Sequence, residues 1–167
     1  RRRAKVGIVG AGNRIRKIYC PIFDALERDY EITGVCSRSQ ESAERIAGRF
    51  GTKSYANSEE MVSASLPDFL LVAVSDREVE ATLDRLTKLN VPILVETPFS
   101  WNVRKGRKLV KRISERQLLV GVAEQTPFLP VEQLKQRLID LGLIGRVVSA
   151  DNEFALYAYH GLAGLKA

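Results

Sequence analysis

Short apolar runs alternate along the chain with longer segments in which apolar residues recur three or four positions apart. Continuous runs such as residues 6–9 and 92–95 are typical of strands that are buried on both faces, and the longer segments are typical of amphipathic helices. This alternation predicts parallel βαβ units. We therefore expect an α/β fold with a Rossmann-type, doubly wound parallel sheet. Its strands are expected over residues 6–9, 31–36, 53–55, 68–74, 92–95 and 118–122.

The helices expected between these strands carry recognisable signals. Ser75 and Glu78 have the spacing of a capping box, which predicts a helix that ends near Leu89. Pro21 falls inside the first helix and is expected either to kink it or to mark a tight first turn. The apolar positions of that first helix are Ile18, Ile22, Phe23 and Leu26. The other helices are expected over residues 40–50, 57–64 and 103–116.

A glycine pair follows the first apolar run, in the pattern G-x-G-x-x-I. Gly10 permits a turn too tight for a side chain, and Gly12 allows backbone N–H groups to approach a ligand closely. The start of the following helix then directs unpaired N–H groups at the same place, which suits a phosphate. Ile15 stands where a dinucleotide fingerprint has its third glycine or alanine, a residue that serves helix–strand packing. The motif therefore predicts a dinucleotide site, although a glycine pair after a strand also occurs in an ordinary turn.

The end of the second strand bears on the choice of cofactor. In a dinucleotide-binding fold this end faces the adenosine ribose, where an acidic residue accepts hydrogen bonds from a 2′-hydroxyl and an arginine accommodates a 2′-phosphate. Ser37 and Arg38 occupy this place, and no acidic residue occurs from Ser37 to Gln40. The sequence therefore favours NADP(H) over NAD(H). A solvated arginine in a loop is the alternative.

The pattern changes after the sixth expected strand. Two prolines interrupt residues 124–130, a helix is expected over 131–141, and residues 146–154 alternate like a half-buried strand. A single strand is not stable alone. We therefore expect a dinucleotide-binding domain over 1–123, followed over 124–167 by a linker helix and the first strand of an incomplete substrate or oligomerisation domain.

Composition and charge limit the classes of function. The net charge of +6 and the pI of about 9.5 suit nucleic acid or a phosphorylated cofactor, and the basic segment 104–112 has the spacing of a solvated helix face. Cys20 and Cys36 have no metal-type spacing, and His160 is the only histidine, so a multi-histidine metal site within the chain is excluded. No apolar run approaches the ~20 residues that span a bilayer. We expect a cytoplasmic protein with no membrane or metal partner.

Several segments together resemble the Gfo/Idh/MocA oxidoreductases, the family of glucose-fructose oxidoreductase and inositol dehydrogenase. The resemblance extends over nearly the whole chain and implies an N-terminal Rossmann domain, a C-terminal domain built on an open, mainly antiparallel sheet, and pairing of subunits through that sheet. The segments that carry it are GIVGAGN at Gly7–Asn13, CSRSQESAERIAGRFG at Cys36–Gly51, DFLLVAVSD at Asp68–Asp76, VETPFS at Val95–Ser100 and LIGRVVSADNEF at Leu143–Phe154.

The resemblance also implies which residues surround the cofactor. Those expected around the pyrophosphate are Gly10, Gly12, Asn13, Arg14 and Ile15. Those expected at the adenosine end are Ser37 and Arg38, and those expected towards the nicotinamide are Ser75, Asp76 and Glu96.

The chain departs from the family pattern at the expected catalytic positions. The family's Glu-Lys-Pro signature, whose lysine contacts the substrate oxygen, is Glu96-Thr97-Pro98 here, and Thr97 carries no positive charge. Asp76 and Glu80 stand where the family has a proline and a histidine. His160 is a candidate proton donor, because imidazole titrates near neutral pH; a hydrogen-bonded ring in an aromatic patch is the alternative. The candidate catalytic residues are therefore Glu96, Thr97 and His160.

Three functions are compatible with these observations. The favoured one is an NADP(H)-dependent oxidoreductase that acts on a small sugar-like or other carbonyl substrate. The second is a dinucleotide-binding or sensing member of the family that has lost the catalytic lysine. A nucleic-acid-binding module that uses the basic segment 104–112 is favoured least, because no aromatic stacking platform accompanies it.

Overall fold

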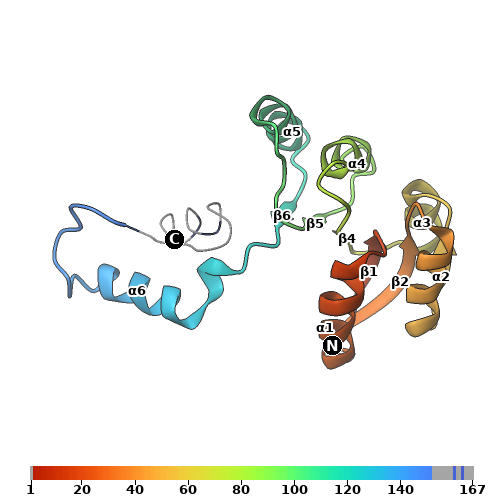
Figure 1. Ribbon diagram of the computed structural model, residues 1–167, viewed down its shortest axis with the longest axis horizontal. Helices are drawn as coiled ribbons and strands as arrows, with labels where there is room; N and C mark the ends of the chain where they lie inside the picture. The colour runs from red at the N-terminus through yellow and green to blue at the C-terminus, as the bar shows by residue number, and fades with distance from the viewer. Residues whose placement is uncertain (1, 152–159, 161–162, 164–167) are drawn as a thin grey trace. The chain divides into compact units, whose positions relative to one another are not determined.

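The computed structural model describes residues 2–151, 160 and 163 and divides the chain into two compact units, Arg1–Ala123 and Glu124–Ala167. The first unit contains a parallel sheet of six strands in the order β3-β2-β1-β4-β5-β6 (Figure 1). This arrangement confirms the predicted doubly wound fold. The strands are β1 Ala4–Val9, β2 Tyr30–Cys36, β3 Ser54–Tyr55, β4 Phe69–Val72, β5 Ile93–Val95 and β6 Val120–Val122.

Helices cover both faces of this sheet. One buried cluster packs α1 and α2 against strand residues such as Ile8, and the other packs α3, α4 and α5 against residues such as Val9. Consecutive strand residues point to opposite faces, so both faces require apolar side chains, and this requirement produces the continuous apolar runs. The helices are η1 Ile15–Tyr19, α1 Cys20–Ala25, α2 Gln40–Arg49, α3 Ser58–Ser65, α4 Val79–Leu86 and α5 Val103–Glu115.

The first helix contains a π turn. The amide of Cys20 donates to the carbonyl of Ile15, a bond that encloses one more residue than an α-helical bond, and Pro21 lies in the first turn of α1 that follows. The buried face consequently carries Ile15, Cys20 and Phe23. Three of the four expected apolar positions, namely Ile18, Ile22 and Leu26, are instead about 40% exposed.

The predicted helix over residues 75–89 was too long at both ends, and its capping box was wrong. The carbonyl of Ser75 accepts from the amides of Glu78 and Val79, so a turn precedes α4. Glu78 caps the helix without a side-chain hydrogen bond, and its carboxylate instead accepts from the hydroxyl of Ser75. Glu78 therefore reaches back to Ser75, but it accepts from the hydroxyl of Ser75 and not from the backbone N–H that a capping box requires.

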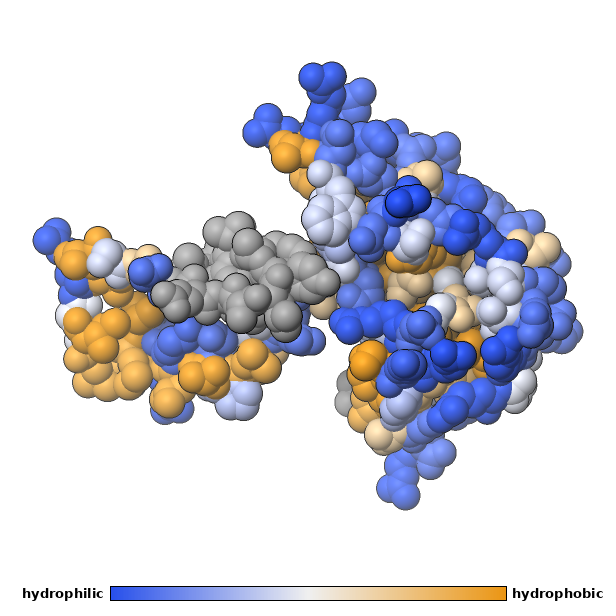
Figure 2. Space-filling model, in the orientation of Figure 1, coloured by the Kyte–Doolittle hydropathy of each residue, from blue (hydrophilic) through white to orange (hydrophobic). Residues whose placement is uncertain are grey.

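The second unit contains η2 Thr126–Phe128 and α6 Pro130–Asp140. Figure 2 shows apolar side chains on the surface of α6, where Val131 and Leu134 are both more than half exposed. Residues 146–151 do not form the strand that was predicted over 146–154, and residues 152–154 lie outside the described residues. Alternating polarity alone does not form a strand, because strand hydrogen bonds require a neighbouring strand.

Candidate dinucleotide site

The carboxyl ends of β1, β2 and β4 lie at one edge of the sheet and border a cleft of about 790 Å³. In doubly wound sheets, ligands bind at this edge where the strand order reverses, which here is between β1 and β4. Five of the predicted cofactor residues line the cleft: Gly10, Gly12, Ser37, Arg38 and Ser75.

The two glycines of the motif have different physical roles. Gly10 has a φ of 107°, and a Cβ built there would lie 2.2 Å from the carbonyl oxygen of Ala73 on the loop after β4. Gly10 thus allows the ends of β1 and β4 to approach closely. A Cβ at Gly12 would meet no atom of the described residues within 4 Å. Gly12 therefore leaves open space at the cleft, as the approach of a pyrophosphate requires.

The residues after Gly12 lie beside the cleft. Helical structure begins at Asn13, whose side-chain oxygen accepts from Arg16 at 2.5 Å, and the amide of Arg16 donates to the carbonyl of Gly12. Asn13 and Arg16 border a smaller hollow of about 280 Å³ that also includes Gly12. Ile15 is fully buried in the core. Its side chain therefore cannot contact a pyrophosphate, and only its backbone is available for the predicted role.

The part of the cleft that follows β2 contains an ion pair that the sequence did not predict. Arg38 Nε lies 2.8 Å from Glu78 Oε1, and the hydroxyl of Ser75 donates to Glu78 Oε2 at 2.8 Å. Arg38 is thus paired at the surface of the cleft, and its side chain is 81% exposed. Asp76, which was expected towards the nicotinamide, does not line the cleft.

Glu96 is the centre of a largely buried polar network. Its Oε1 accepts from Arg14 Nε at 2.5 Å and from the hydroxyl of Tyr19 at 2.8 Å, and its Oε2 accepts from the amide of Thr97 at 3.0 Å. Burial, followed by the hydrogen bond to Glu96, raises the pKa of Tyr19 well above its usual value. The Tyr19 hydroxyl therefore stays protonated at neutral pH and donates a hydrogen bond to Glu96. This network connects the first helix to the loop after β5.

Glu80 fixes the end of the β5–α5 loop, next to the first turn of α5. Its carboxylate accepts from the hydroxyl of Ser100 at 2.7 Å and the amide of Asn102 at 3.0 Å, and Lys105 Nζ lies at 3.0 Å. The hydrogen bond from Ser100, followed by that from Lys105, lowers the pKa of Glu80 to about 2. Glu80, which the family resemblance places at the position of a histidine, thus has a structural role here.

This lowered pKa predicts a pH-dependent contribution to stability. The contribution is complete above the ordinary carboxyl pKa of 4.5 and is lost as the pH falls towards about 2. Glu80→Gln is therefore expected to lower the urea midpoint at about pH 6 and to differ less from the wild-type chain at about pH 3. Paired urea titrations measure this difference. A gap that stays constant between the two pH values would contradict the assignment.

His160 belongs to the second unit, where its Nδ1 lies 2.6 Å from Glu124 Oε2. Burial raises the pKa of Glu124, but hydrogen bonds from Thr126 and His160 outweigh it and leave that pKa lowered. The aromatic patch considered for His160 involves Tyr157 and Tyr159, which lie outside the described residues. The histidine is thus held by a carboxylate, and its catalytic role stays a prediction.

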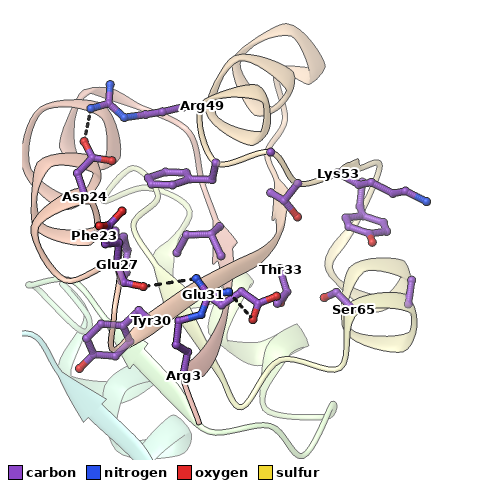
Figure 3. A pocket seen from close by; sticks show the side chains of 16 residues that line it. Arg3, Phe23, Asp24, Glu27, Tyr30, Glu31, Thr33, Arg49, Lys53 and Ser65 are labelled. Atoms are coloured by element: carbon purple, nitrogen blue, oxygen red, sulfur yellow. Dashed lines mark hydrogen bonds and ion pairs between the residues drawn. The ribbon is translucent and has the colours of Figure 1, made fainter. Parts of the chain in front are cut away.

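Another hollow, of about 870 Å³, lies at the opposite edge of the sheet, where β1, β2 and β3 begin (Figure 3). Four of its charged side chains form two pairs, Arg49 with Asp24 and Arg3 with Glu31. The buried hydroxyl of Thr33 has no hydrogen-bond partner in the described part of the chain, and Thr33 is the extra residue where the register between β1 and β2 shifts. The glycine motif lies at the other edge, so the cleft of about 790 Å³ at the carboxyl ends of the strands is the better cofactor site.

In residues 2–151, 160 and 163, no helix is long and apolar enough to cross a membrane. Within the same residues, no group of three or more histidine, cysteine or acidic side chains is placed to hold a metal ion.

The strand order and the glycine-lined cleft define a dinucleotide-binding Rossmann domain. The family model GFO_IDH_MocA, described as an oxidoreductase family with an NAD-binding Rossmann fold, matches residues 4–124. The chain therefore belongs to the Gfo/Idh/MocA family. It spans 36% to 45% of the length of the curated relatives that it matches, with 24% to 25% identity.

Solved structures show the same fold. An oxidoreductase of Thermotoga maritima, TM0312, has 27% identity and a TM-score of 0.77, with 86% of this chain and 45% of that one covered. The WlbA dehydrogenase of Bordetella pertussis, solved with NADH and UDP-GlcNAcA, has 21% identity and a TM-score of 0.77 over 87% and 42%. KijD10, a 3-ketoreductase of Actinomadura kijaniata solved with NADP, has 22% identity and a TM-score of 0.73 over 87% and 44%.

Proposed function

We propose that this chain is the dinucleotide-binding part of an NADP(H)-dependent oxidoreductase. The protein transfers hydride between nicotinamide and a small sugar-like or other carbonyl substrate. The observation that carries the proposal is the cleft at the carboxyl edge, bordered by Gly10 and Gly12 on one strand end and by Ser37 and Arg38 on the next. The WlbA structure contains NADH and the KijD10 structure contains NADP, so these similar structures do not decide between the two cofactors. Arg38 is the reason for preferring NADP(H).

The residues of the cleft fit the chemical groups of such a cofactor. The backbone after Gly12 would hold the pyrophosphate, since a helix begins there and the space in front of Gly12 is open. Arg38 would hold the ribose 2′-phosphate, because its planar guanidinium matches a phosphate. When bound, nicotinamide supplies or accepts the hydride. The chain's own contribution is to orient the cofactor.

The proton that accompanies hydride transfer requires a donor. Both carboxylate oxygens of Glu96 are already engaged, one by Arg14 and Tyr19 and the other by Thr97. Glu96 therefore supports the loop and is poorly suited to release a proton. Thr97 lacks the positive charge that would stabilise a substrate oxyanion. This arrangement favours a second candidate function, a dinucleotide-binding or sensing member of the family that does not turn over.

Titration with NADPH and NADH tests the cofactor assignment. Arg38→Ala is expected to weaken NADPH binding by about ten-fold and to change NADH binding little, because the variant loses a charge-assisted contact that only the 2′-phosphate makes. Nicotinamide fluorescence gives both dissociation constants. Tighter binding of NADH by the wild-type chain would refute the preference for NADP(H) and leave the fold assignment intact.

Turnover separates the two candidate functions. The full-length protein is mixed with NADPH and a panel of keto-sugars, and oxidation of the cofactor is followed by its absorbance. Substrate-dependent oxidation supports the oxidoreductase. Tight NADPH binding with no oxidation across the panel supports the binding or sensing protein.

A further inference from the structure

The ion pair between Arg38 and Glu78 joins two walls of the cleft. Arg38 follows β2 and Glu78 directly precedes α4, and both side chains line the cavity. Arg38 is 81% exposed, whereas Glu78 is 29% exposed. The pair therefore lies at the surface of the cleft, where an entering ligand can reach it.

Glu78 is the fixed member of this pair. Its Oε2 accepts from the hydroxyl of Ser75 at 2.8 Å, and its amide donates to the carbonyl of Ser75 at 2.8 Å. Its own carbonyl accepts from the amide of Thr82 in α4 at 2.8 Å. Arg38, a long side chain exposed to solvent, is the member that can change partner.

The charges around the cleft make Glu78 distinctive. Arg38, Arg77 and Arg85 line the cavity, and Glu78 is the one carboxylate among its described lining residues. Arg85 pairs with Glu59, 3.7 Å away. A phosphate that enters the adenosine end therefore meets several cations and a single fixed negative charge.

We propose that Glu78 sets the discrimination between NADPH and NADH by competing with the ribose 2′-phosphate for Arg38. The inference rests on the proposed function. A phosphate that binds Arg38 must displace the Glu78 carboxylate and then lie near its negative charge, and both effects weaken NADPH binding. NADH carries no 2′-phosphate and leaves the pair intact. Glu78 therefore lowers the affinity for NADPH and leaves the affinity for NADH unchanged. It thus reduces the preference for NADPH over NADH that Arg38 provides.

A double-mutant cycle tests this competition. The dissociation constants of NADPH, NADH and adenosine 2′,5′-bisphosphate are measured for the wild-type chain, Glu78→Gln, Arg38→Ala and the double variant. Glu78→Gln is expected to bind NADPH and the bisphosphate about five-fold more tightly, with NADH unchanged within about two-fold. The gain should shrink at high salt, and it should be clearly smaller when Arg38 is alanine, because only the repulsion between Glu78 and the phosphate then remains.

Glu115→Gln is the matched control. It removes the same charge from α5, where Glu115 pairs with Lys111 at 3.7 Å and does not line the cleft. All three ligands should bind this variant as they bind the wild-type chain. Thermal unfolding of each variant verifies that it is folded.

Four outcomes overturn the proposal: an unchanged affinity of Glu78→Gln for the bisphosphate, an equal gain for NADH, a gain of undiminished size without Arg38, or binding of the bisphosphate by neither protein. Failure of the proposed function gives a different result. If the wild-type chain binds neither dinucleotide but Glu78→Gln gains affinity for the bisphosphate through Arg38, the oxidoreductase assignment fails and the competition stands.

Discussion

Gly10→Ala is expected to destabilise the first unit by about 3 kcal/mol or more, because it combines backbone strain with a clash. The new Cβ would lie 2.2 Å from the carbonyl oxygen of Ala73, and a φ of 107° is unfavourable for alanine. Gly10 also donates its amide to the carbonyl of Cys36 at 2.8 Å, so a shift of Gly10 disturbs the pairing of β1 with β2. The free energy of unfolding, from urea titration, measures this cost.

Gly12→Ala is the matched variant, with the same added methyl group two residues later. A Cβ there meets open space, so the fold should tolerate it within about 1 kcal/mol. The methyl group would, however, occupy space needed by a pyrophosphate, and NADPH binding should weaken at least about ten-fold. Equal stabilities of the two alanine variants would contradict the different roles assigned to the glycines.

Glu96→Ala is expected to destabilise the chain by about 2 to 4 kcal/mol. The substitution leaves the hydroxyl of Tyr19 and the amide of Thr97 without their acceptor and leaves Arg14 without its carboxylate. The side chain of Arg14 is half exposed, so water compensates part of the lost ion pair and the loss should lie nearer about 2 kcal/mol.

Glu96→Gln separates the charge from the shape of this network. The amide oxygen can still accept from Tyr19 or Thr97, so about half of the loss should be recovered. Urea titrations of the two variants at neutral pH measure the difference. Variants as stable as the wild-type chain would show that Glu96 is not a structural residue, which would strengthen its candidacy as a catalytic group.

The strands could be predicted because burial on both faces leaves a strong local signal. The runs before Gly10 and around Leu71 have no polar alternation, and both lie at the centre of the sheet. Once parallel strands are predicted, their carboxyl ends must meet at one edge. Ser37 and Arg38 were predicted from this fold to share a site with the glycine motif, and Ser75 was predicted from the family resemblance. The structure brings all three to one cleft.

The partners of these residues could not be predicted in the same way. Glu78 had the local spacing of a capping residue, and only the three-dimensional arrangement shows that it pairs with Arg38. Tyr19 carried no motif, yet it donates to Glu96 from 77 positions away in the sequence. Such long-range polar pairs depend on side-chain directions that a single sequence does not encode in any periodic pattern.

The π turn at the start of the first helix also concerns how this chain is aligned with its relatives. A π turn is equivalent to an α-helix that has gained one residue, with the surplus absorbed inside the turn. A homologue with a regular helix at this place would match both the glycine motif and the buried face around Phe23 only if its alignment carries a one-residue gap between Arg14 and Cys20. An ungapped alignment would instead pair the buried Phe23 with a residue that faces solvent in the homologue.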